Sequence, residues 1–67
     1  MPQQTDLRTA EDNVHQGEIN VACQQGIIDL KRRRRQDTEL SELILQTLED
    51  SLALHRAHLG QLQTAQS

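Results

Sequence analysis

The sequence predicts an all-α fold, a two-helix antiparallel hairpin that dimerises into a four-helix bundle. Apolar residues recur at intervals of three and four rather than two, which is the period of a helix. The single proline, Pro2, stands at the start of the chain, so no later proline interrupts a helix. With 67 residues and no Phe, Tyr or Trp, one copy builds only a small core. Small proteins offset such a shortage with disulfides, metals or partner subunits.

The first helix is predicted over about residues 6–34. Two threonines are candidate starts, Thr5 and Thr9, and the sequence TAED resembles a capping box that pairs Thr9 with Asp12. Apolar residues at three–four spacing form a single stripe along this helix. The stripe consists of Leu7, Ala10, Val14, Gly17, Val21 and Ile28.

A turn and a second helix follow. The predicted bounds are a turn at about residues 35–37, a helix over about 38–62 and a frayed tail over 63–67. Asp37 is a preferred N-cap, because its carboxylate accepts hydrogen bonds from unpaired amides of the first turn. Glu39 and Glu42 lie where the helix dipole favours anions. The stripe of the second helix consists of Leu45, Leu48, Leu52, His55, Leu59 and Leu62.

The two stripes match when the chain folds back at residues 36 and 37. The predicted register places Ile28 near Leu45, Val21 near Leu52 and Val14 near Leu59. Stripes of alternating three–four spacing suit the left-handed packing of coiled coils. Glycine inside a helix costs about 1 kcal/mol relative to alanine, so we expect Gly17 and Gly26 to permit close approach of the helices.

A second set of apolar residues lies outside these stripes. On the first helix it consists of Ile19, Cys23, Gly26, Ile27 and Leu30, nearly opposite the stripe, and on the second of Leu40, Leu43, Ile44 and Leu54. Two helices in contact along one line cannot bury both sets, and two-fold dimers are the commonest oligomers. We therefore predict self-association, with a dimer favoured, through Ile19, Cys23, Ile27, Leu30, Leu40, Leu43, Ile44 and Leu54. The alternative is that these residues are ordinary surface aliphatics.

Five consecutive cations are predicted at the hairpin tip of a chain whose net charge is −3. They are Lys31, Arg32, Arg33, Arg34 and Arg35. A polyanion contact is one interpretation, because short basic runs bind nucleic acid. A structural role is favoured, because cations complement the dipole at a helix C-terminus and bond its last carbonyls. The chain also lacks aromatic residues for base stacking. An acidic protein docked on the tip is a third alternative.

Three histidines and one cysteine are the candidate metal-binding and reactive groups. The predicted register places His15 opposite His58 and Glu18 opposite His55. Metal sites in helical bundles use Glu-x-x-His motifs; their absence leads us to expect hydrogen-bonded histidines and neither metal nor cofactor. Cys23 is expected to be a small buried hydrophobe. No nucleophile with a neighbouring base and no phosphate-binding glycine loop is recognised, so a non-enzymatic protein is predicted.

No export signal or membrane span is recognised in the chain. Its first residues, MPQQTDLRTAEDN, are polar and lack the apolar core of a signal peptide. The longest strictly apolar run extends only from Leu43 to Leu45. We therefore expect a cytoplasmic protein that has no membrane partner.

The segments AEDNVHQGEINVACQQGIIDL and DTELSELILQTLEDSLALHRAHLGQL resemble a widespread group of very short, uncharacterised alphaproteobacterial proteins. The matching positions are Ala10, Glu11, Gly17, Glu18, Ala22, Gln24, Ile27, Ile28, Asp37, Thr38, Leu54, His55 and Arg56, within about residues 10–62. The resemblance implies a helical hairpin and carries over no activity. Where the group has a turn glycine, this chain has Arg35, which argues against a tight left-handed turn.

These features predict a small non-enzymatic protein that acts through protein–protein interaction or regulation and self-associates through apolar helix faces. The alternative is a nucleic-acid-associated accessory protein that uses the basic tip, residues 31–35. The sequence does not identify a protein partner.

Overall fold

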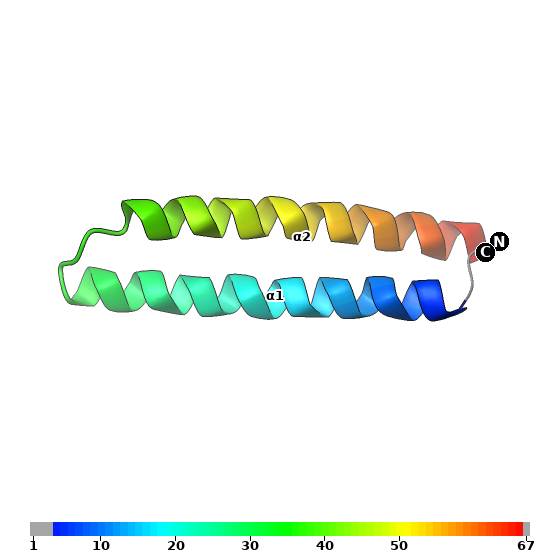
Figure 1. Ribbon diagram of the computed structural model, residues 1–67, viewed down its shortest axis with the longest axis horizontal. Coiled ribbons are helices and arrows are strands. Elements are labelled where there is room, and N and C mark those ends of the chain that lie inside the picture. The colour runs from blue at the N-terminus through cyan, green and yellow to red at the C-terminus, as the bar shows by residue number, and fades with distance from the viewer. Residues whose placement is uncertain (1–3, 67) are drawn as a thin grey trace.

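The protein is a single helical hairpin in a computed structural model that describes residues 4–66 and the side chains of residues 5–65 (Figure 1). Helix α1 (Gln4–Arg33) and helix α2 (Glu39–Gln66) run antiparallel and are joined by one short turn. Within residues 4–66 there is no β-strand. The rod measures 51 × 14 × 13 Å. The predicted all-α hairpin is therefore confirmed for one chain.

The helix ends differ from the predicted ends in two places. Helix α1 begins at Gln4, so Thr9 lies inside the helix and the predicted capping box at this residue is wrong. Helix α2 continues to Gln66, so the predicted frayed tail is helical through that residue, and Ser67 lies outside the described residues. Gln and Ala are tolerated well in helices, and the Thr64 hydroxyl donates a hydrogen bond to the Gly60 carbonyl (2.9 Å).

The helices meet along the two predicted stripes, whose members are all buried or half-buried. Among residues 5–65 the buried apolar core consists of Ala10, Ile28 and Leu52, with 3%, 3% and 5% of their surface exposed. Gly17 marks a close approach, because a Cβ atom added there would lie 3.0 Å from Leu52 Cδ1. Gly26 has open space around it, so the predicted close-approach role is confirmed for Gly17 and wrong for Gly26.

The turn begins with a left-handed residue, although that residue is an arginine. Arg35 has a φ of 55°. Its amide donates to the Arg32 carbonyl (3.1 Å), and the Gln36 amide donates to the Lys31 carbonyl (2.8 Å). This pair of bonds is a Schellman motif, in which glycine is the usual left-handed residue. The turn is therefore left-handed despite the missing glycine, at a cost of roughly 1–2 kcal/mol for a residue with a Cβ atom.

Asp37 orders the start of α2 through its side chain, although the N-cap is the next residue, Thr38, and not Asp37 as predicted. The Asp37 Oδ1 atom accepts a hydrogen bond from the Glu39 amide (3.0 Å). The Thr38 carbonyl accepts the next one, from the Glu42 amide (2.8 Å). These bonds satisfy part of the unpaired first turn and fix the direction in which α2 leaves the turn.

Replacing Arg35 with glycine should stabilise the hairpin. We expect Arg35→Gly to raise the free energy of unfolding by about 1 kcal/mol, because glycine adopts the left-handed conformation without the Cβ penalty. Thermal and urea unfolding at one fixed protein concentration measure the change. Arg35→Gln is the matched control: it removes the same charge and keeps the Cβ atom. Equal effects of the two substitutions would contradict the argument.

Substitutions of two glycines test the close approach of the helices. Gly17→Ala forces a methyl group against the buried Leu52 side chain, whereas an added Cβ at Gly60 meets nothing within 4 Å. Alanine favours a helix by up to about 1 kcal/mol at either position. We expect Gly60→Ala to stabilise the protein and Gly17→Ala to be less stable than Gly60→Ala by about 1 kcal/mol or more. Equal unfolding midpoints for the two variants would show that the Leu52 side chain moves aside without cost, which would contradict the close approach.

Candidate interaction surface

The two long sides of the hairpin differ in chemistry, and a simple rule assigns residues to them. Successive residues of a helix are about 100° apart, so the residues before and after an inward residue lie on opposite sides. Two antiparallel helices are exchanged by a two-fold axis perpendicular to the plane that contains them. This rotation keeps each side of that plane on its own side. Residues that precede inward positions on α1 and on α2 therefore share one side of the rod, and residues that follow them share the other.

One side carries the predicted self-association residues, which we call the apolar face. It consists of Ile19, Cys23, Ile27 and Leu30 on α1 and Leu40, Leu43, Ile44 and Leu54 on α2. Six of the eight directly precede a buried or half-buried residue. Ile19 and Leu43 each lie midway between two such residues, so they point away from the contact line and form the margin of this face. The seven aliphatic members are 42–72% exposed, and Cys23 is exposed too. Among the described residues, five of the seven exposed large aliphatic side chains thus lie on one side of the rod, and the other two lie at its margin.

The opposite side is acidic. Glu11, Glu18, Asp29, Glu42 and Glu49 each follow directly after a buried or half-buried residue. Two of these carboxylates make ion pairs across the hairpin: Glu42 with Arg32 (2.6 Å) and Glu18 with Arg56 (3.2 Å). All four side chains are about half-exposed or more, so each pair adds at most about 1 kcal/mol. The charged side chains of this side are satisfied by water and by ion pairs within the chain. The aliphatic side chains of the apolar face have no such partner within the chain.

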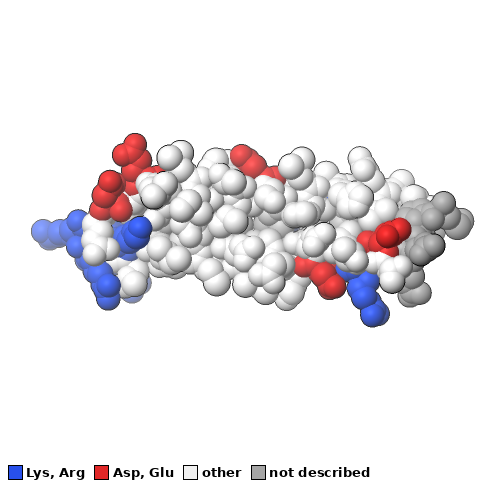
Figure 2. Space-filling model, viewed as in Figure 1, with Lys and Arg blue, Asp and Glu red and all other residues white. Residues whose placement is uncertain are grey.

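The predicted run of five cations divides into two parts. Lys31 is half-buried and donates a hydrogen bond to the hydroxyl of buried Ser41 (2.6 Å), and Arg32 is paired with Glu42. Both lie against α2 instead of projecting from the tip. The remaining arginines, 33–35, form no side-chain ion pair with any described residue. We call them the arginine tip; Figure 2 shows most Lys and Arg side chains at the turn end of the rod, with Asp and Glu side chains beside them.

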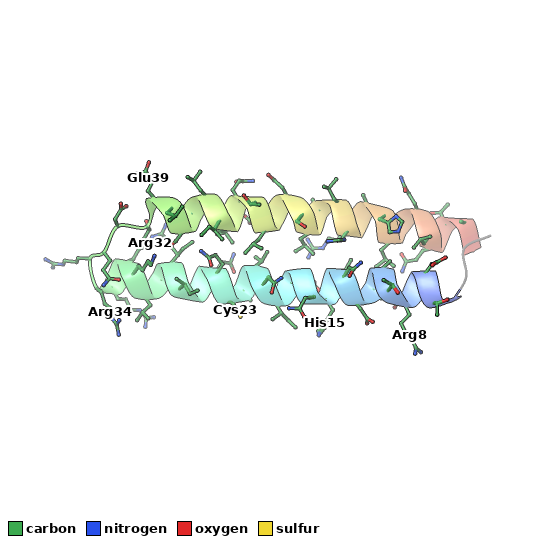
Figure 3. All side chains as sticks on the ribbon, viewed as in Figure 1. Arg8, His15, Cys23, Arg32, Arg34 and Glu39 are labelled. Atoms are coloured by element: carbon green, nitrogen blue, oxygen red, sulfur yellow. The ribbon has the colours of Figure 1, made fainter. Side chains whose placement is uncertain are left out.

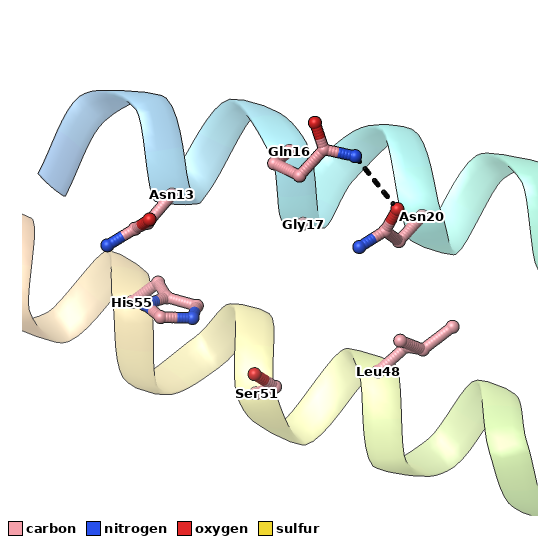
Figure 4. A pocket seen from close by; sticks show the side chains of 7 residues that line it. All are labelled: Asn13, Gln16, Gly17, Asn20, Leu48, Ser51 and His55. Atoms are coloured by element: carbon pink, nitrogen blue, oxygen red, sulfur yellow. Dashed lines mark hydrogen bonds between the residues drawn. The ribbon is translucent and has the colours of Figure 1, made fainter. Parts of the chain in front are cut away.

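A shallow hollow of about 120 Å³ opens beside the apolar face, toward the chain ends (Figure 4). Its polar lining consists of Asn13, Gln16, Asn20, Ser51 and His55, with Gly17 and Leu48 completing it. Gln16 donates through Nε2 to Asn20 Oδ1 (3.0 Å), so the side-chain carbonyl of Gln16 keeps its acceptor capacity. The first four polar residues each precede an inward residue, so the hollow opens on the same side as the apolar face. The sequence analysis had not identified it.

The candidate metal-binding and thiol groups lie apart in the structure. Among residues 5–65 no group of three or more His, Cys, Asp or Glu side chains could hold a metal ion. The Glu18 carboxylate accepts a hydrogen bond from Arg56, and no histidine side chain among residues 5–65 forms a hydrogen bond, so the expectation of hydrogen-bonded histidines is wrong. Cys23 is exposed on the edge of α1 that faces away from α2, so the expectation of a buried cysteine is wrong for one chain (Figure 3).

In the described part of the chain, neither helix is long and apolar enough to cross a membrane. The chain matches no protein-family model, no curated protein and no solved structure. The resemblance to short alphaproteobacterial hairpin proteins therefore stays a prediction. A function must therefore be inferred from the geometry of three surface features: the apolar face, the arginine tip and the polar hollow.

Proposed function

We propose that this protein is a small non-enzymatic interaction or regulatory protein that self-associates through its apolar face. The observation that carries the proposal is the contrast between core and surface. Among residues 5–65 three apolar side chains are buried, whereas seven Leu and Ile side chains are exposed, five of them on one side of the rod. Exposed apolar side chains that gather on one side of a small protein are typical of an interaction site.

The free energies involved are large enough for a dimer. Fully burying a Leu or Ile side chain contributes about 1.5–3 kcal/mol, so burying the remaining half of one contributes about 1 kcal/mol. Five such side chains on this side in each of two copies make ten, or about 10 kcal/mol in total. Association costs roughly 4–15 kcal/mol in lost freedom. Apolar burial therefore offsets the cost of association, and close packing of the two faces decides the affinity.

The absence of an enzymatic role is part of the proposal. Within the described residues, the polar hollow is a shallow depression rather than an enclosed cavity. It holds one half-buried histidine, His55, and no carboxylate or thiol lines it. Ligand sites usually enclose most of a substrate and combine several convergent polar groups. A surface for another protein fits this rod better.

Two variants test self-association: one places a charge in the apolar face of α2, and the other places it on the acidic side. We expect the purified chain to elute with twice its mass of 7.6 kDa in light scattering coupled to size exclusion. Ile44→Glu should weaken the dimer at least tenfold, because it places a charge in the apolar face. Ala53→Glu is the control: it adds the same charge on the acidic side, next to Leu52. A monomer at high micromolar concentration, with Ile44→Glu unchanged in helicity, would refute the proposal.

A second candidate function is binding to nucleic acid, favoured by the three unpaired cations of the arginine tip. Three phosphate contacts predict a log–log dependence of duplex binding on salt with a slope of about −2.7. If this function holds, the triple variant Arg33→Gln, Arg34→Gln and Arg35→Gln removes binding, whereas Lys31→Gln leaves the slope unchanged. Titration of labelled duplex at two salt concentrations measures both. Binding that survives the triple variant would exclude the tip as the contact.

A further inference from the structure

The apolar face has polar groups of opposite character at its two ends. Arg34 lies four residues after Leu30 and seven after Ile27, so it continues the strip of exposed apolar residues on α1. Its amide still makes the helical bond to the Leu30 carbonyl (3.1 Å), which keeps its Cα atom on the helix surface. Figure 3 shows Arg34 on the same edge of α1 as Cys23.

The other end of the strip carries a carboxylate and amide oxygens. Asp12 lies seven residues before Ile19, and Gln16 lies seven before Cys23, so both continue the strip toward the chain start. Asp12 is exposed and makes no ion pair with any described residue. Gln16 borders the polar hollow together with Asn13. This end therefore offers acceptors, while the tip end offers the donors of a guanidinium group.

The position of the apolar residues fixes how two copies can overlap. On α1 they extend from Ile19 to Leu30, and their midpoint lies between Gln24 and Gln25. A two-fold axis through that midpoint, perpendicular to the rod, places Arg34 of one copy level with His15 of the other. Asp12 is three residues away from His15, about 4.5 Å along the helix. Gln16 is its immediate neighbour. The tip of each copy then lies over the acceptor end of its mate.

We propose that a second copy docks antiparallel on the apolar face, with Arg34 of each copy seated against Asp12 and the polar hollow of the other. The inference rests on the proposed self-association. Charge selects the antiparallel arrangement over the parallel one. Residues 29–44, at the turn end, carry a net charge of +1, because four carboxylates lie among the five cations, and the rest of the chain carries −4. Parallel copies would set the two arginine tips together, whereas antiparallel copies set each arginine tip near Asp12 of the mate.

Distances between spin labels distinguish the two arrangements. Labels attached at Thr9→Cys or at Gln36→Cys, each in a Cys23→Ser background, report the spacing between equivalent residues of two copies. The antiparallel dimer predicts spacings of about 45 Å at residue 9 and about 30 Å or more at residue 36, from a rise of 1.5 Å per residue. Short spacings, under about 20 Å at both positions, would establish a parallel dimer and overturn this inference while leaving self-association intact. No dipolar coupling, together with a monomeric mass, would overturn both.

A charge reversal tests the Arg34 contact itself. Arg34→Asp and Asp12→Arg should each weaken the dimer about tenfold or more, because the two-fold axis repeats every contact. The double variant should recover most of the loss. Arg33→Asp is the matched control: it makes the same charge change one residue earlier, on a different side of α1. Equal weakening by Arg33→Asp and Arg34→Asp, or no recovery in the double variant, would overturn the contact. Circular dichroism of each variant verifies that the helices remain folded.

Discussion

The structure depends on one constraint: two helices touch along a single line. Each helix presents about one residue in three or four to that line, and the rod is only 13–14 Å thick. Even the residues on the line are mostly half-buried, and no side chain among the described residues is fully enclosed. A pair of helices without aromatic residues therefore has little interior. Whatever apolar surface lies off the line stays in water unless another molecule covers it.

The helix pairing, the side-chain hydrogen bond of Asp37 at the start of α2 and the close approach at Gly17 could be predicted because each depends on local spacing or local chemistry. Ser41 was missed because a serine does not register in an apolar pattern, although it is the most buried polar residue at 3% exposure. The three–four spacing does continue through it: the stripe of α2 extends back from Leu45 to Ser41 and Thr38, and that of α1 includes Gln24 and Lys31. Polar residues close the stripe near the turn, where the Gln24 amide and the Lys31 ammonium bond Ser41.

The periodicity of a single helix could not predict the side of the hairpin on which its exposed residues lie. A helical period gives the angle of a residue around its own axis, and it gives the position around the hairpin only when the contact line is known. Once the contact line is known, the apolar-face residues of α1 and α2 are found on the same side of the hairpin. The carboxylates of the two ion pairs, Glu18 and Glu42, lie on the other side. The hollow beside Gln16 was missed for the same reason, because its residues come from both helices.

The arginine at the left-handed turn position connects stability with the proposed assembly. A cation near a helix C-terminus contributes about 0.3–1 kcal/mol through the helix dipole. That is less than the roughly 1–2 kcal/mol that the left-handed conformation costs a residue with a Cβ atom. The fold of one chain therefore gives no net reason for arginine at position 35, where φ is 55°. Backbone strain of this kind is common at binding sites. In the proposed antiparallel dimer, the arginine tip lies near Asp12 of the mate, so a cation at position 35 strengthens the attraction between the two copies.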